Sequence, residues 1–367
     1  MKQRIKIVCC VTNDLTQDRR MHRICTSLSI AGYDVTLVGR KKHSSKQLAT
    51  FPFSTHRLTI SHQQGPLFYW SYNQALTTYL LQTKPHIIYA VDTDTLLGAG
   101  RAVGKLQCKF IYDAHEYFTE VPELEGKHIK KAIWKAVERK YIPQTHLRFT
   151  VAQGLADVLE RIHGAAFFVV RNTPTKPLVR HLNTSKSTKT ILYQGVLNKG
   201  RGLTEMIAAM QMLDDHSIQL KIVGGGDIEL ALQEQASKSS AASRIHFMGW
   251  QTGPELEKST QEAWLGINLL DAKSLNYRYS LANKFFDYMH AGIPSINMDL
   301  PEYRKIISAH KVGLLLGDLQ PATIATAINS LDDKCYLSMV DAASLAAEKY
   351  CWQADEEVLL AKVAQLS

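Results

Sequence analysis

The sequence is poor in the features that mark membrane, secreted and metal-binding proteins. It has only six cysteines, which form no C-x-x-C pair and have no histidine nearby at metal-ligand spacing. Its apolar stretches, such as the one from Ile5 to Val11, are far shorter than the roughly 20 residues that cross a bilayer. No apolar stretch of signal-peptide length follows the first four residues. We therefore expect reduced thiols, no bound metal, no transmembrane helix and a cytoplasmic protein.

Acidic residues are scarce in the first half of the chain. Residues 1–175 contain 24 Lys and Arg against 13 Asp and Glu, whereas the net charge of the whole chain is only +9. The remaining residues are therefore slightly acidic. A basic field of this kind attracts polyanions, which include nucleic acid, anionic lipid and phosphorylated substrates.

The sequence is rich in short apolar runs that alternate with amphipathic stretches. Such runs in the first half are IKIVCCV, YDVTLVG, PHIIYAV, CKFIYDA and LRFTVA, and those in the second include TILYQGV, SIQLKIV, RIHFMGW and IPSINM. This rhythm predicts an α/β fold of two Rossmann-like domains with mostly parallel sheets facing a central cleft. Ligands of such sheets bind beyond the carboxyl ends of the strands, so we expect the site in that cleft.

A polar segment rich in Ser and Thr interrupts this alternation after Pro177. We expect one Rossmann-like domain over residues 1–175, an exposed linker over 176–189 and a second domain over 190–350. The helix predicted over 351–367 is expected to pack back towards the amino-terminal domain.

Two glycine-containing loops follow predicted strands of the second half. YQGVLNKGRGL places Lys199 and Arg201 just before a helix, and KIVGGGD places Gly224 and Gly225 in the equivalent position. Glycines let a backbone approach a phosphate, whose charge a helix amino terminus and an arginine offset. The alternative is a pair of tight turns with solvated cations.

The segment NYRYSLANKFFDYMHAGIP carries the most informative pattern. It predicts a helix from Ala282 to His290 with Lys284 and Asp287 on one face. A lysine is unfavourable near a helix amino terminus, which suggests that an anion shares the site. The alternative is an intrahelical ion pair between Lys284 and Asp287, worth roughly a few tenths of a kcal/mol.

These segments resemble the family 4 retaining glycosyltransferases of the GT-B fold. The likeness covers nearly the whole chain, through YDAHEYF, VVRNTP, YQGVLNKGRG, HFMGW, NKFFDYMHAGIP and the helix with Trp352. It implies transfer of a sugar from a nucleotide diphosphate sugar, UDP- or GDP-linked, to an acceptor hydroxyl with retention, in cell-surface polysaccharide or glycolipid assembly. Domain 1–175 would then hold the acceptor side and domain 190–350 the donor. The leaving diphosphate would help to deprotonate the acceptor, and protein cations would replace a metal ion.

The resemblance also assigns roles to individual residues. Arg201 would hold the donor diphosphate, Asp287 the ribose, and His115 would face the sugar and the diphosphate. The catalytic set is His115, Arg201 and Lys284. The donor-binding set is Gly195, Arg201, Gly224, Gly225, Gly249, Trp250, Tyr279, Ser280, Asn283, Lys284 and Asp287, in which Gly249 and Trp250 flank the base.

Two departures from the family pattern affect this assignment. The first of the family's two spaced glutamates is replaced by Tyr279, and the second by Asp287. The family's arginine early in the YQG loop is replaced by Val196. Arg201 and Lys284 would therefore have to neutralise the diphosphate together, and sugar recognition is the least transferable property.

Four residues of the first half are candidates for acceptor contact: Asp18, Arg19, Arg20 and Glu116. Asp18 could instead cap the helix that follows it, and Glu116 could be a solvated carboxylate. The nearest approach to a D-x-D metal motif is Asp92-Thr93-Asp94, which we interpret as the cap of a helix after strand IIYAV.

A basic amphipathic pattern covers residues 127–141. Apolar residues from Ile129 to Tyr141 share one side, and lysines surround them. Two interpretations stay open. The apolar stripe either packs into the amino-terminal domain, or lies on an anionic membrane surface at the inner face of the membrane, near a lipid-linked acceptor.

Three other functions are compatible with parts of the pattern. A sugar-nucleotide epimerase could share the fold and act without an acceptor. The basic first half could belong to a nucleic-acid-binding protein, although interleaved aromatics and a recognition helix are missing, so we expect no nucleic-acid partner. Tyr279 would also fit a relative that has lost activity.

Overall fold

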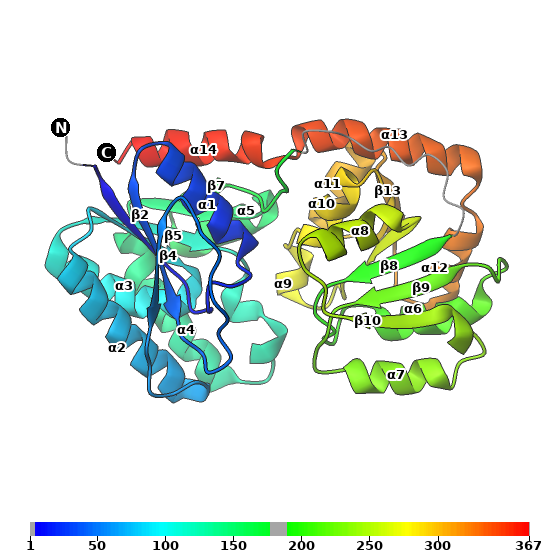
Figure 1. Cartoon of the computed structure of the whole chain (residues 1–367), viewed down its shortest axis with the longest axis horizontal. Helices are drawn as coiled ribbons and strands as arrows, with labels where there is room; N and C mark the ends of the chain where they lie inside the picture. Colours follow the sequence, from blue (N-terminus) through cyan, green and yellow to red (C-terminus); the bar gives the residue numbers. More distant parts are fainter. Residues whose placement is uncertain (1–3, 177–188, 367) are drawn as a thin grey trace. The chain divides into compact units, whose positions relative to one another are not determined.

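The computed structural model describes residues 4–176 and 189–366 and divides the chain into two units (Figure 1). Unit 1 comprises residues up to Asn172 together with those from Asp355 onward, and unit 2 comprises Thr173–Ala354. Nearly all of the expected linker, residues 177–188, lies outside the described residues. The helix α14 (Trp352–Ala364) contributes most of its length to unit 1, where Asp355 accepts hydrogen bonds from the Arg171 backbone and side chain at 3.1 and 3.3 Å.

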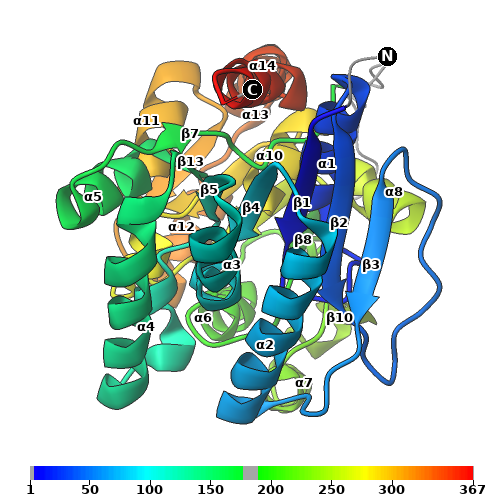
Figure 2. The same cartoon turned by 90° about the vertical axis from the view of Figure 1, so that its left-hand side faces the viewer.

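Unit 1 is built on one parallel sheet of seven strands in the order β3-β2-β1-β4-β5-β6-β7 (Figure 2). All strand pairs are parallel, and β4 is buried along its entire length, as a sheet covered on both faces requires. The strands are β1 (Lys6–Cys10), β2 (Asp34–Arg40), β3 (Ser54–Leu58), β4 (Ile87–Val91), β5 (Lys109–Ala114), β6 (Leu147–Thr150) and β7 (Phe168–Val169).

Helices cover both faces of this sheet. Helices α2, α3 and α4 pack side by side, and α1 lies on the opposite face from them (Figure 1). The helices are α1 (Arg19–Ile30), α2 (Gly65–Thr83), α3 (Asp92–Leu106), α4 (His128–Tyr141) and α5 (Gln153–His163), with short 3₁₀ turns η1 (Phe118–Glu120), η2 (Pro122–Leu124) and η3 (Ile142–Gln144).

Unit 2 repeats this plan with a parallel sheet of six strands in the order β10-β9-β8-β11-β12-β13. Its strands are β8 (Thr190–Gln194), β9 (Gln219–Val223), β10 (Ile245–Gly249), β11 (Leu265–Asn268), β12 (Ser295–Met298) and β13 (Gly313–Leu316). Its helices are α6 (Leu203–Ala209), α7 (Glu229–Ser237), α8 (Pro254–Glu262), α9 (Leu275–Arg278), α10 (Asn283–His290), α11 (Pro301–His310), α12 (Pro321–Asn329) and α13 (Asp333–Lys349), with η4 (Met210–Met212) and η5 (Ala242–Arg244). The prediction of two Rossmann-like α/β domains with parallel sheets is confirmed.

The strand order fixes where each sheet can bind a ligand. The order reverses between β1 and β4 in unit 1 and between β8 and β11 in unit 2, and such a reversal opens a crevice at the carboxyl ends of the strands. Within the described residues, no helix combines the length and the apolar composition needed to cross a membrane.

Candidate active site

Three glycine loops meet at the carboxyl edge of the sheet in unit 2. The Gly195 backbone N–H donates to the Val223 carbonyl oxygen at 2.9 Å, and the Gly224 backbone N–H donates to the Gly249 carbonyl oxygen at 2.8 Å. Gly224 adopts a φ of +139°, and a Cβ there would lie 1.9 Å from the Gly195 carbonyl oxygen, so only glycine permits this contact. Trp250 lies against Gly225, so closely that a Cβ on Gly225 would lie 2.5 Å from the indole nitrogen of Trp250. The structure thus brings together five residues of the predicted donor set.

Lys284 lies in the first turn of α10 and points towards these loops. Its side chain is 7% exposed, and its Nζ lies 3.6 Å from the centroid of the Tyr193 ring. A Cβ built on Gly195 would lie 3.5 Å from the same Nζ. Among the described residues, Nζ has no hydrogen-bond partner. The alternative of an intrahelical ion pair with Asp287 is therefore wrong.

Arg201 is the second cation of this site. Its guanidinium carbon lies 4.8 Å from the centroid of the Tyr277 ring, and its Nε is buried without a hydrogen bond to any described residue. Burial and the charge of Arg201 hold the pKa of Lys284 well below its ordinary value. The two cations therefore lie close enough to repel each other, and a bound anion would relieve this repulsion.

Asp287 follows Lys284 by one helical turn. Its Oδ2 accepts a hydrogen bond from Gln194 Nε2 at 3.0 Å, and Thr260 in turn donates to Gln194 Oε1 at 2.8 Å. This chain of hydrogen bonds orients the carboxylate at the end of β8. Three further members of the predicted donor set lie on the connection between α9 and α10: half-buried Tyr279, Ser280, which donates to the Tyr277 carbonyl, and Asn283 at the start of α10.

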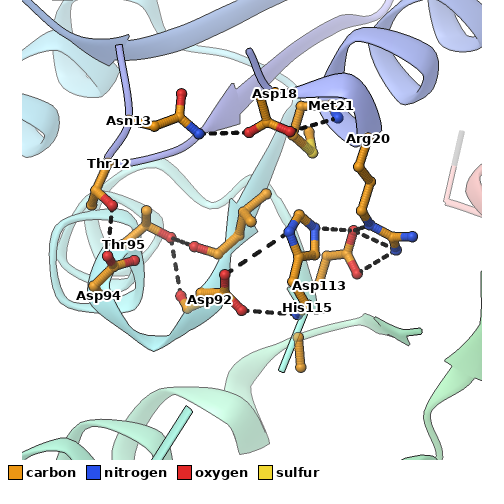
Figure 3. A network of polar contacts seen from close by, with 12 residues as sticks. Thr12, Asn13, Asp18, Arg20, Met21, Asp92, Asp94, Thr95, Asp113 and His115 are labelled. Atoms are coloured by element: carbon orange, nitrogen blue, oxygen red, sulfur yellow. Dashed lines mark hydrogen bonds and ion pairs between the residues drawn. The ribbon is translucent and has the colours of Figure 1, made fainter. Parts of the chain in front are cut away.

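His115 lies at the end of β5 in unit 1, inside a network of carboxylates (Figure 3). Its Nε2 is 3.1 Å from Asp113 Oδ2, and its Nδ1 is 3.9 Å from Asp92 Oδ2. Asp113 is fully buried and also accepts from Arg20 and Tyr89, at 2.8 Å each. Although burial raises it, the charges of Arg20 and His115 hold the pKa of Asp113 well below its ordinary value. Asp113 therefore stays ionised.

Two of the acceptor candidates at the start of α1, Arg20 and Asp18, have structural roles. Arg20 is only 3% exposed and gives its guanidinium to Asp113 and to the Val170 carbonyl. The expectation that Arg20 meets an acceptor has to be corrected, because burial and these bonds remove it from the surface. Asp18 caps α1 by accepting from the Met21 backbone at 3.0 Å. Arg19 is exposed, and Glu116 is half-buried after His115.

The interpretation of Asp92-Thr93-Asp94 as a helix cap is wrong. The cap residue of α3 is Val91, which makes no side-chain capping bond. Asp92 Oδ1 instead accepts from the His115 backbone N–H at 2.8 Å, and Asp94 Oδ2 accepts from Thr12 at 2.6 Å. Burial raises the pKa of Asp92 to about 8 and that of Asp94 to about 6. No group of three or more His, Cys, Asp or Glu side chains in the described part of the chain could hold a metal ion.

The basic helix α4 is buried near its carboxyl-terminal end and exposed near its amino-terminal end. Tyr141 is buried, and the Trp134 ring packs edge-on against Tyr69 and Phe118. Ile129 and Ile133 are 80% and 57% exposed. The interpretation that the apolar stripe packs into unit 1 thus holds for the later part of the helix, and the membrane interpretation of its exposed start stays a prediction.

Two family models match the chain. The model described as a glycosyl transferase 4-like domain matches residues 16–173, and the model described as glycosyl transferases group 1 matches residues 188–333. Together they cover most of both units. No curated protein sequence matches the chain.

Solved structures share the fold over nearly the whole chain. Sucrose-phosphate synthase from Thermosynechococcus elongatus has a TM-score of 0.81 at 17% identity, and the match covers 99% of each chain. HepE from Anabaena, in complex with UDP and glucose, has a TM-score of 0.79 at 12% identity, with 98% of this chain and all of HepE covered. WaaG, a glycosyltransferase involved in lipopolysaccharide biosynthesis, has a TM-score of 0.74 at 12% identity, covering 96% and 98%.

Proposed function

The chain is a glycosyltransferase with the GT-B fold, and from that premise we propose that it transfers a hexose from a nucleotide diphosphate sugar with retention, as family 4 enzymes do. The observation that carries the proposal is the pair of cations in unit 2. Lys284 is buried without a hydrogen-bond partner among the described residues, beside Arg201 and three glycine loops. An uncompensated buried ammonium is costly, and a diphosphate would offset that cost.

The donor nucleotide would occupy the edge of the sheet in unit 2. Trp250 is 60% exposed beside Gly225, where its ring can contact a base, and the Asp287 carboxylate can accept hydrogen bonds from ribose hydroxyls. We propose UDP as the first nucleotide to test and GDP as the second, since HepE, which shares this fold, was solved with UDP. Gly195 and Gly224 would let the diphosphate approach the backbone.

The reaction would proceed on one face of the sugar. The acceptor oxygen forms a bond to the anomeric carbon as the bond from that carbon to the diphosphate breaks. The electron pair of the broken bond stays on the diphosphate oxygen, and that oxygen takes the acceptor proton. Lys284 and Arg201 would stabilise the charge that grows on the leaving group, an effect that is larger in a site shielded from water.

Thermal unfolding with UDP-, GDP-, ADP- and CMP-sugars tests the proposal. A ligand at 100 times its dissociation constant adds about 2.7 kcal/mol to the stability of the folded state. We expect one diphosphate-sugar family to stabilise the wild type, and Lys284→Ala and Arg201→Ala to respond weakly. Lys199→Ala is the matched control, since Lys199 is an exposed cation of the same loop. Equal stabilisation of all four proteins would refute the assignment.

Product analysis separates transfer from epimerisation. An epimerase of this fold would convert the donor sugar in the absence of any acceptor. We expect donor alone to yield at most slow hydrolysis, and added glycan or lipid-linked acceptor to yield a new glycosidic bond that keeps the anomeric configuration of the donor.

We also propose that an anionic membrane surface is a partner of unit 1. Four apolar side chains at the starts of α2 and α4 are more than half exposed: Leu67, Trp70, Ile129 and Ile133. Exposed Lys127, just before α4, and exposed Lys130, in its first turn, are close in sequence to Ile129 and Ile133, and the contact between Tyr69 and Trp134 joins the two helices. Apolar residues framed by lysines are typical of a surface that lies on anionic lipid.

Vesicle sedimentation tests this partner. We expect the protein to bind vesicles that contain phosphatidylglycerol and not vesicles of phosphatidylcholine alone. Ile129→Ser with Ile133→Ser should reduce binding at least fivefold. Ile162→Ser is the control, because Ile162 is 53% exposed on a different helix, α5. An equal loss in the control, or no loss in the double variant, would contradict the proposal.

A further inference from the structure

Each of the two cations in unit 2 lies over the ring of a buried tyrosine. Lys284 Nζ is 3.6 Å from the centroid of the Tyr193 ring. The guanidinium carbon of Arg201 is 4.8 Å from the centroid of the Tyr277 ring. Tyr193 and Tyr277 are 1% and 6% exposed. The face of an aromatic ring attracts a cation within about 6 Å, and most strongly where water is excluded, so both pairs are attractive.

The same tyrosines hold the glycine loop between β8 and α6. The Tyr193 hydroxyl donates to the Val196 carbonyl oxygen at 2.7 Å. The Tyr277 hydroxyl donates to the Lys199 carbonyl oxygen at 3.4 Å, and a Cβ on Gly200 would lie 3.0 Å from the Tyr277 ring. Each tyrosine therefore contacts a cation with its ring and the loop with its hydroxyl, which fixes the cation and the loop in one geometry.

The two rings are neutral groups and not counter-ions. Burial holds the pKa of Tyr193 well above its ordinary value, so its hydroxyl keeps the proton at neutral pH. The Tyr277 hydroxyl donates to a carbonyl oxygen, which requires that it also carries its hydrogen. A carboxylate in either position would neutralise the cation and compete with an anionic ligand. A neutral ring stabilises the cation and leaves its charge available to the ligand.

Lys284 needs such a contact because two effects oppose its charge. Burial and the field of Arg201 both lower the pKa of Lys284. Within the described residues, no hydrogen bond to Nζ counters them. The contact with the Tyr193 ring acts in the opposite direction, since it favours the ammonium over the neutral amine.

We infer that Tyr193 and Tyr277 are positioning residues for the donor diphosphate: their rings hold Lys284 and Arg201 in place and stabilise the two charges before the ligand binds. This role rests on the proposed transferase function and deepens it. The tyrosines act through the two cations and need no contact with the substrate. Cations fixed in advance can meet the charge of the leaving group without rearrangement.

Paired substitutions at each tyrosine test the inference. Phenylalanine keeps the ring and loses the hydroxyl, whereas leucine loses both. We expect Tyr193→Leu and Tyr277→Leu to weaken the binding of UDP at pH 7 at least 20-fold. Tyr193→Phe and Tyr277→Phe should stay within fivefold of the wild type. Calorimetric titration with UDP, and with GDP in parallel, measures both affinities.

Tyr336→Leu is the matched control. Tyr336 is another buried tyrosine of unit 2, on α13; its hydroxyl donates to the Trp264 carbonyl oxygen at 3.1 Å, and its ring stacks on the Trp264 indole. Its substitution should lower the unfolding temperature and leave the nucleotide affinity within twofold of the wild type. An equal loss of affinity in Tyr336→Leu would overturn the inference.

The dependence of affinity on pH provides a readout that a purely structural role would not change. Arg201 stays protonated between pH 5 and pH 9, so the loss in Tyr277→Leu should be the same throughout this range. Lys284 can lose its proton, and removal of the Tyr193 ring should lower its pKa further. Relative to the wild type, the affinity of Tyr193→Leu should therefore begin to fall at a lower pH. Within the described residues, Arg201 is the charged group whose field acts on Lys284, and it does not titrate in this range.

The outcomes distinguish this inference from the proposed function. Binding of neither UDP nor GDP to the wild type would overturn the function, and this inference with it. Wild-type binding with both leucine variants within threefold of it would overturn the positioning role and leave the function intact. Phenylalanine variants that bind as weakly as the leucine variants would do the same. If Tyr193→Leu does not fold, the two variants of Tyr277 decide by these criteria.

Discussion

Each unit contains a buried cation, and the two cations differ in their hydrogen-bond partners. In unit 1, Arg20 is 3% exposed and donates to a fully buried Asp113 at 2.8 Å. In unit 2, Lys284 is 7% exposed, and its Nζ has no hydrogen-bond partner among the described residues. Unfavourable burial persists only where something offsets it, and Asp113 offsets it for Arg20 within the fold. For Lys284 we propose that a ligand supplies the missing partner, which would distinguish a binding site in unit 2 from the structural ion pair in unit 1.

The largest effect should come from breaking the structural pair. Asp113→Ala leaves Arg20 buried without its carboxylate, and we expect a loss of about 3 to 5 kcal/mol in the free energy of unfolding, measured with urea. The double variant Arg20→Met with Asp113→Leu should recover most of this loss, since two apolar residues need no partner. A cost below about 1 kcal/mol for Asp113→Ala would show that the pair is not essential to the fold.

Removal of Lys284, which has no hydrogen-bond partner among the described residues, should have the opposite consequence. Lys284→Met should leave the unfolding free energy of the ligand-free protein unchanged or higher, because the charge that it removes is costly when buried. Its affinity for UDP should fall about 100-fold, which corresponds to about 2.7 kcal/mol. Calorimetric titration measures this affinity, with Lys199→Met as the control. A clear loss of stability without UDP would mean that Lys284 is structural, like Arg20.

Stability measured over a range of pH should distinguish two carboxylates of unit 1, Asp92 and Asp113. Burial raises the pKa of Asp92 to about 8 in the folded protein, whereas an unfolded aspartate titrates near 3.9. The folded state therefore keeps a proton that the unfolded state has lost, and Asp92 destabilises the protein increasingly as the pH rises from about 4 to 8. Asp92→Asn removes this effect. Its gain in unfolding free energy over the wild type should grow by at least about 1 kcal/mol between pH 5 and pH 8.

The sign of this pH effect can be checked against a neighbouring group. Asp113 has a lowered pKa, so its stabilising contribution is present above the unfolded pKa and is lost only in strong acid. The titration of Asp113 itself therefore adds no pH dependence to the stability between pH 5 and pH 8. A gain for Asp92→Asn that stays constant or shrinks over this range would contradict the assignment of its pKa.

The smallest effect is expected from chelation. If Lys284 and Arg201 neutralise the leaving diphosphate, EDTA should change the transfer rate by less than twofold. Addition of Mn²⁺ or Mg²⁺ after dialysis tests whether a metal ion raises the transfer rate. Strong dependence of the rate on either ion would mean that a metal, rather than the two side chains, balances the diphosphate.

The sequence predicts the site of unit 2 far better than that of unit 1. Gly195, Gly224 and Lys284 follow or begin regular elements with local signals, namely a strand before a glycine or a helix start. The network of unit 1 depends on distant partners, because Arg20 and Asp113 are 93 residues apart, and no local pattern connects them. The prediction of a helix cap at Asp92 is wrong for the same reason: an acidic residue at a helix start usually caps the helix, and only the fold shows the contact of Asp92 with His115.

The two interpretations of α4 could not be separated from the sequence, for a different reason. Helical periodicity predicts one apolar stripe that includes Ile129 and Tyr141. It cannot indicate which part of that stripe other elements of the domain cover. Tyr141 is covered and Ile129 is not. Which of the two residues is buried depends on the other elements of unit 1 and not on the sequence of α4 alone.

Unit 1 takes its residues from two separate parts of the chain, and this imposes an order on its assembly during synthesis. Asp355 is 3% exposed and binds the Arg171 backbone and side chain, yet 183 residues of polypeptide lie between them. The ribosome makes the seven strands of unit 1 first and the Asp355 segment only after all of unit 2. The first domain to emerge is thus the last to be completed, and until then it exposes the surface that α14 will cover.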